Sequence, residues 1–134
     1  MKLYRIISLG LCVIFIMVGL IFLFLPQEVL VFFNSLSERL GMIPSPIVAK
    51  NFYLILAVGY MYLVAVLAYM MFRQPENHVF PLLLVHGKWA SALLSLYLFL
   101  SHSPFLIYLT NFLVDGFLGS VVLFFYFKLK VIKK

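Results

Sequence analysis

The stretch IISLGLCVIFIMVGLIFLFL, residues 6–25, decides the fold, because its twenty residues carry no charge. A helix rises about 1.5 Å per residue, so a run of this length crosses the roughly 30 Å hydrocarbon core of a bilayer. Comparable runs follow at residues 52–72, 79–100 and 105–127, and only the last two contain a charge, near the centre. Apolar and polar residues do not alternate as in strands. The pattern therefore predicts four membrane-spanning helices.

The composition supports the same interpretation. The chain is 66% hydrophobic and 10% charged, with a mean hydropathy of +1.16, whereas soluble domains are roughly half apolar and a quarter charged. Residues 6–25 could instead form a signal peptide, but the run is about twice the usual length and ends at Pro26 without a small-residue cleavage site. We therefore expect residues 1–134 to form a single transmembrane domain, an all-α, integral membrane four-helix bundle.

The long connection at residues 26–51 has a pattern of its own. Apolar and polar residues are interspersed at helical spacing over 27–40, which predicts a short amphipathic helix lying in the membrane interface. Gly41 ends this helix, and Pro44-Ser45-Pro46 forms a stiff turn. The helix could pack against the bundle as a simple cover. It could also cover an outward-facing cavity or provide a docking surface for a partner.

The net charge of +6 is unevenly distributed. The positive residues expected on one side are Lys2, Arg5, Arg73, Lys128, Lys130, Lys133 and Lys134. On the other side, Arg39 and Lys50 are offset by Glu28 and Glu38. The positive-inside rule then places both termini in the cytoplasm. The basic tail favours anionic lipid headgroups, and we do not expect nucleic-acid binding.

A lysine and an aspartate interrupt the last two apolar runs at the same depth. A lone charge in hydrocarbon is costly, so Lys88 and Asp115 are each other's expected partner. Ser91 and Ser95 share the helical stripe of Lys88, and Asn111 shares that of Asp115. Heptad spacing in the second run places Tyr62 at mid-depth, and the first run offers a stripe at Ser8, Cys12, Phe15 and Gly19. The predicted interior lining is Tyr62, Lys88, Ser91, Ser95, Asn111 and Asp115.

The Lys88/Asp115 pair has several interpretations. As a structural pair it would fix one arrangement of the helices without adding much net stability. As a functional pair it would form a small-molecule, quinone or proton-handling site, because burial and a neighbouring charge shift lysine ionisation in opposite directions. Separate, unpaired roles for the two residues are the third alternative.

Other residues that could carry chemistry do not form a pattern. Cys12 is the single cysteine and is expected to pack in the core. His86 points away from Lys88, towards lipid, another subunit or the flank of the bundle, and Trp89 faces lipid or packs. Haem would require two facing histidines at one depth, whereas His78 and His102 fall at opposite ends. We therefore expect neither a cofactor nor a metal site.

The first run ends in GLIFLFLP, residues 19–26, and short helices follow it. In this architecture the chain resembles the DoxX-like family of small four-helix membrane proteins. The resemblance implies a bacterial cytoplasmic (inner) membrane protein, in some cases a subunit of a quinone-linked oxidoreductase. Lys88 and Asp115 match no site of that family, so the resemblance assigns no functional residue.

Two functional hypotheses remain. The first is a non-enzymatic accessory or interaction subunit, associated with other membrane proteins or with copies of itself in the lipid bilayer. The alternative is a small-molecule, quinone or proton-handling site built on Lys88 and Asp115, with Tyr62 nearby. An enzyme is not favoured, because the sequence has no carboxylate pair and no nucleophile–base set.

Overall fold

The computed structural model describes residues 2–47 and 52–132, with the backbone alone for Phe52 and residues 129–132. Within these ranges the regular structure is entirely helical, and the all-α prediction is confirmed. The expected positions of Lys50, Lys133 and Lys134 lie outside the described residues. The helices are α1 (Lys2–Phe24), α2 (Pro26–Arg39), α3 (Phe52–Arg73), α4 (Val79–Ser101) and α5 (Leu106–Ile132).

Four of the helices, α1, α3, α4 and α5, are long and apolar enough to cross a membrane. Between 22% and 28% of the residues in their apolar windows are buried inside the protein. Most of the large apolar side chains on these helices therefore lie on the outer surface. A soluble monomer rarely exposes apolar surface to this extent.

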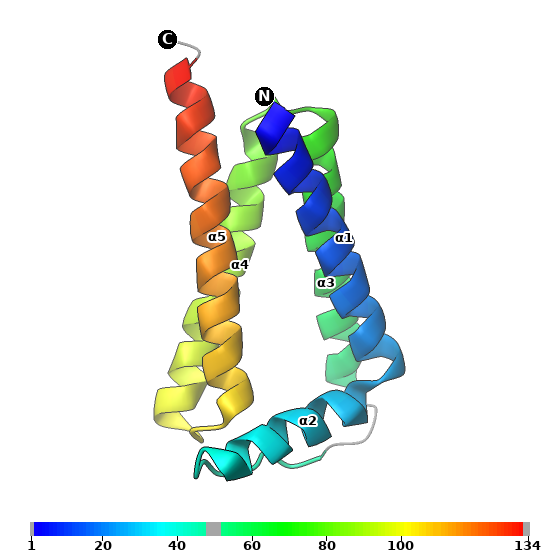
Figure 1. Ribbon diagram of the computed structural model, residues 1–134, viewed down its shortest axis with the longest axis vertical. Coiled ribbons are helices and arrows are strands. Elements are labelled where there is room, and N and C mark those ends of the chain that lie inside the picture. The colour runs from blue at the N-terminus through cyan, green and yellow to red at the C-terminus, as the bar shows by residue number, and fades with distance from the viewer. Residues whose placement is uncertain (1, 48–51, 133–134) are drawn as a thin grey trace.

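The long helices form two antiparallel pairs, α1 with α3 and α4 with α5 (Figure 1). Close approach within each pair depends on glycine. A Cβ atom at Gly19 would lie 3.2 Å from Cβ of Met61, and one at Gly119 would lie 2.5 Å from Cδ1 of Trp89. Small residues at such crossings let helix backbones approach each other, as is common between membrane helices.

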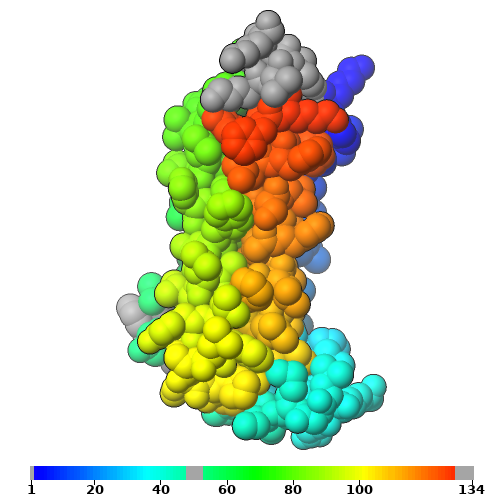
Figure 2. Space-filling view, turned by 90° about the vertical axis from the view of Figure 1, so that its left-hand side faces the viewer, coloured from blue at the N-terminus to red at the C-terminus, as the bar shows by residue number. Residues whose placement is uncertain are grey.

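The two pairs meet through α3 and α4 and separate towards the end where α2 lies (Figure 1). Between described residues, α1 and α5 make at most a marginal contact. The described chain ends and the turn between α3 and α4 lie at the opposite end of the bundle from α2 (Figure 1). Figure 2 shows the α4 and α5 side chains packed against each other, with α2 projecting beneath them.

Helix α2 lies across the open end of the bundle and contacts both α1 and α5. It begins at Pro26, whose fixed φ suits the first turn of a helix. It ends in a Schellman motif: Gly41 has φ +67°, and the N–H of Met42 donates to the carbonyl of Ser37 at 2.9 Å. The Asn34 side chain then pins the following segment, donating to the Ser45 carbonyl at 2.7 Å and accepting from its N–H at 2.8 Å. The predicted helix at 27–40 is confirmed as a helix.

Candidate functional site

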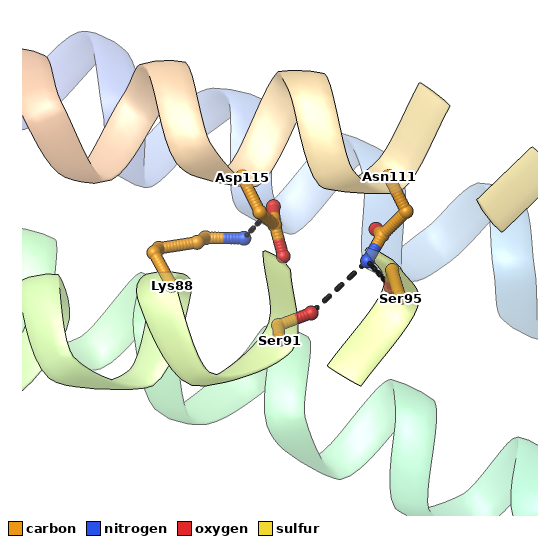
Figure 3. A network of polar contacts seen from close by, with 5 residues as sticks. All are labelled: Lys88, Ser91, Ser95, Asn111 and Asp115. Carbon is orange, nitrogen blue, oxygen red and sulfur yellow. Dashed lines mark hydrogen bonds and ion pairs between the residues drawn. The ribbon is translucent and has the colours of Figure 1, made fainter. Parts of the chain in front are cut away.

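A buried ion pair links α4 to α5. Nζ of Lys88 donates to Oδ1 of Asp115 at 2.8 Å, and the two side chains are 2% and 6% exposed (Figure 3). Each residue lies nine positions after the first residue of its helix, and the helices are antiparallel, so the two side chains meet near mid-length. The predicted contact is confirmed. Its strength depends on the low-dielectric surroundings, which also make either charge costly without the other.

Two aromatic rings surround the ammonium group. Nζ of Lys88 lies 4.5 Å from the ring centroid of Phe15 and 5.2 Å from that of Tyr60. Both distances are within the range of cation–π attraction. Helices α1 and α3 therefore contribute to holding a charge that belongs to the other helix pair. The ion pair is the place where all four long helices meet.

An amide–hydroxyl cluster lies one helical turn from the ion pair. Nδ2 of Asn111 donates to Oγ of Ser91 at 3.0 Å and to Oγ of Ser95 at 2.7 Å (Figure 3). Both amide hydrogens of Asn111 are thus used. Each serine accepts a bond through its oxygen, so its own hydroxyl proton remains a donor. The expected α4 and α5 stripes face each other as predicted.

The predicted position of Tyr62 is wrong. Its side chain is 73% exposed, and Tyr60 occupies the inner position, beside Lys88. Two residues correspond to about 200° around a helix, so the error inverts the face of α3. The buried side of α3 is formed by Met61, Val64, Ala65, Ala68 and Met71. Ala68, near the middle of this side, lies about 80° around the helix from Tyr60 and about 120° from Tyr62, so it was the signal that favoured Tyr60.

The other sequence-based candidates fall in different places. The α1 stripe is confirmed, since Ser8, Cys12, Phe15 and Gly19 are all buried. His86 is exposed, and Trp89 is partly exposed while it also packs against Gly119. Among the described residues, no group of three or more histidine, cysteine or carboxylate side chains is arranged to hold a metal ion.

A partly open cavity of about 480 Å³ reaches the ion pair from between the helix pairs. It extends along the bundle from Lys88 and Asp115 to Phe33 of α2. Most of its wall is apolar, and its polar part is formed by side chains of α3, α4 and α5 around the ion pair, with Leu118 beyond them. The lining residues are Ile14, Phe15, Val18, Phe22, Phe33, Ala57, Tyr60, Met61, Lys88, Ser91, Ile107, Thr110, Asn111, Val114, Asp115 and Leu118.

One polar group in the cavity wall lacks a partner. The Tyr60 hydroxyl oxygen is buried and makes no hydrogen bond among the described residues. Ser91 is close enough to interact with it, but the two hydroxyls do not have hydrogen-bond geometry. A buried hydroxyl without a partner is costly. The polar part of the cavity wall therefore contains a covered hydroxyl whose hydrogen-bonding capacity the protein itself does not use.

No protein-family model matches this chain, and no curated protein or solved structure is significantly similar to it.

Proposed function

We propose that the protein is integral to a membrane, with α1, α3, α4 and α5 crossing the bilayer and α2 lying in the outer interface. The exposed apolar surface of the four helices supports this arrangement, because lipid would cover it. Lys2, Arg5 and Arg73 lie on the segments at the end opposite α2, which favours a cytoplasmic location for that end. The DoxX-like resemblance implies a bacterial cytoplasmic membrane.

Within that membrane, the protein binds a small, largely apolar molecule in the cavity between its helix pairs. The observation that carries this proposal is the cavity of about 480 Å³ that reaches a buried ion pair. Well-packed protein interiors have few voids larger than a water molecule. Ligand pockets are typically about 300–1,000 Å³, mostly apolar, with a few convergent polar groups. The cavity has these properties.

The ion pair makes this cavity more than a packing defect. The side chains of Lys88 and Asp115 are only 2% and 6% exposed, and both nevertheless belong to the cavity wall, so the pair gives this wall a polar part. Quinones and other carbonyl compounds are ligands that such a polar part of the wall could recognise by hydrogen bonding. Proton handling by the pair is compatible with the same geometry.

The test is purification in mild detergent followed by mass spectrometry of the intact protein. We expect wild-type protein to carry a small lipophilic molecule of defined mass. Ala57→Phe, which places a ring in the cavity wall, should lose it. Ala90→Phe is the matched control, because Ala90 is an exposed alanine outside the lining. Protein that is free of any such molecule, and that takes up none when it is added, would contradict the proposal.

A second candidate function is that of an accessory subunit of a membrane assembly. Two polar side chains on the outer surface favour it, since His86 and Tyr62 are exposed on helices that would lie in lipid. Polar groups at hydrocarbon depth usually meet a partner helix. If this candidate is right, a stoichiometric membrane partner, or a second copy, should co-purify with wild-type protein. It should be lost from the His86→Leu variant.

A further inference from the structure

We infer that the cavity takes up a neutral, lipid-soluble molecule directly from the bilayer, through the gap between α1 and α5. The ligand's hydrogen-bond-accepting head, such as a carbonyl, lies at the hydroxyls of Tyr60 and Ser91. This inference rests on the proposed binding function and adds to it the route of uptake and the chemical class of the ligand.

The route follows from which helices touch. Helix α1 packs on α3, α3 on α4, and α4 on α5, which leaves the α1–α5 side of the bundle without a substantial contact. The cavity is lined from both helices that border this side. Ile14 of α1 and Val114 of α5 belong to the cavity wall and are nevertheless 51% and 49% exposed. Residues that face a cavity and the outer surface together mark an opening, and these two lie on the helices that border the α1–α5 gap. Ala57 of α3 is a third exposed lining residue, so the opening extends to α3.

The level of the opening indicates the source of the ligand. Ile14 precedes Phe15, whose ring contacts Lys88, and Val114 precedes Asp115, so the opening lies at the level of the ion pair. In a bilayer this level is the hydrocarbon core. The end nearer the outer interface is covered by α2, which contributes Phe33 to the wall and contacts α1 and α5. A molecule dissolved in lipid therefore reaches the cavity more easily than one dissolved in water.

The head of the ligand follows from the donors in the polar part of the cavity wall. The Tyr60 hydroxyl has no hydrogen-bond partner among the described residues. Oγ of Ser91 already accepts from Asn111, so its remaining capacity includes a proton to donate. Two hydroxyl donors in one cavity wall suit a carbonyl oxygen, which can accept two hydrogen bonds; the Tyr60 oxygen is covered in the ligand-free protein, so its side chain moves slightly when the ligand binds. Acceptance of both would satisfy the otherwise unpartnered hydroxyl.

The charge of the ligand follows from the ion pair. Lys88 and Asp115 neutralise each other at 2.8 Å. A charged head would add an uncompensated charge to low-dielectric surroundings, or would have to separate the existing pair. Either outcome is unfavourable, so the site selects against both anionic and cationic heads. The ion pair therefore acts as a neutral wall and not as a charged receptor.

The head chemistry is tested with three probes that share one chain: oleamide, oleyl sulfate and oleyltrimethylammonium. We expect oleamide to bind purified protein at least about tenfold more tightly than either charged probe. Tyr60→Phe should weaken oleamide binding about tenfold, without lowering the thermal stability of the ligand-free protein, because the lost hydroxyl had no partner. Tyr62→Phe is the control and should change neither. Preference for a charged probe, or unchanged binding by Tyr60→Phe, would overturn the assignment of the head.

The route is tested with oleamide carrying a photoreactive diazirine, incorporated into vesicles with the protein. Ile14→Trp and Val114→Trp should reduce labelling of the cavity at least about fivefold. Val13→Trp and Leu113→Trp alter neighbouring exposed residues outside the lining and should label like wild type. Should a Trp variant not fold, cysteines at positions 14 and 114, in a Cys12→Ala background, can be modified with a bulky thiol reagent after purification.

The outcomes separate the two proposals. Equal labelling of the gap variants and their controls would refute the lateral route, even though the cavity binds a ligand. Failure of all three probes to bind, together with purified protein that carries no lipophilic molecule, would refute the binding function itself.

Discussion

At the scale of single residues, the protein concentrates its polar chemistry at the level where its four long helices meet. Lys88 contacts a carboxylate and two aromatic rings, and Asn111 bonds two serines nearby. Each group except the Tyr60 hydroxyl has a partner within this cluster. Lys88 and Asp115 therefore stabilise each other's charge, and removing one of them should cost more stability than removing both.

This dependence predicts unequal effects of single and double substitutions. Lys88→Met and Asp115→Leu should each lower the free energy of unfolding by about 3–5 kcal/mol, because each leaves one buried charge without its partner. The double variant should lose less than either single variant. Reversible unfolding in mixed detergent micelles measures the three values.

The control for this cycle is Lys128→Met, which removes an exposed lysine at the end of the apolar part of α5. It should change stability little. If the double variant lost as much as the sum of the two single variants, Lys88 and Asp115 would be energetically independent despite their contact.

At the scale of helices, glycine determines how closely α4 and α5 pack. Trp89 of α4 lies over Gly119 of α5, where even a methyl group would meet the indole ring. The neighbouring Gly116 is less constrained, since its Cβ would lie 3.9 Å from that of Ala92. Of these two α5 glycines, only Gly119 therefore lies too close to α4 to accept a methyl group without movement.

Gly119→Ala should accordingly destabilise the protein by about 1–2 kcal/mol, because the indole or the backbone must move to admit the methyl group. Trp89→Ala makes room for the added methyl group. The stability lost by the double variant Gly119→Ala/Trp89→Ala should therefore be smaller than the sum of the losses of the two single variants. Gly10→Ala is the control, since a Cβ there meets nothing within 4 Å and alanine favours a helix. Thermal unfolding in detergent checks these variants, and equal losses for Gly119→Ala and Gly10→Ala would contradict this account.

The end of α2 gives a second test at this scale. Gly41 has φ +67°, a left-handed conformation that side chains other than glycine adopt at a cost of about 1–2 kcal/mol. Gly41→Ala should therefore loosen the Schellman motif and the segment held by Asn34. Amide hydrogen exchange in residues 36–45 should become faster, while exchange in α4 stays unchanged. Unchanged exchange in α2 would show that this turn does not limit its stability.

The positions of the helices can be predicted from the sequence more reliably than the face that each helix buries. The cavity between the helix pairs is the least predictable feature. Apolar runs and their breaks locate α1, α3, α4 and α5, because each run must satisfy its own backbone, and amphipathic spacing locates α2. Counting along antiparallel helices brings Lys88 to Asp115. The inner face of α3 was not predicted because tyrosine occurs both in protein cores and on surfaces. The spacing of tyrosines therefore does not identify which face of the helix is buried. The cavity depends on how far apart two packed pairs lie, and no local pattern encodes that distance.

At the scale of the whole molecule, the arrangement has two distinct ends. The ends of the described chain and the α3–α4 turn lie together, and basic residues cluster there: Lys2, Arg5, Arg73 and Lys128. The opposite end carries α2, in which Glu28 and Glu38 offset Arg39. Such an asymmetry in lysine and arginine would set the orientation of the bundle in a membrane. It would also place α2, with the cavity beneath it, on the side away from the cytoplasm.

This orientation is tested by cysteine accessibility in intact cells, starting from Cys12→Ala so that no native thiol remains. Ser35→Cys on the exposed side of α2 should react with a membrane-impermeant maleimide added outside. Gln74→Cys in the exposed α3–α4 turn should react only after the cells are permeabilised. The opposite pattern would invert the topology and place α2 in the cytoplasm. Because the gap between α1 and α5 lies near mid-length, uptake from lipid would survive that inversion, whereas an outward-facing role for α2 would not.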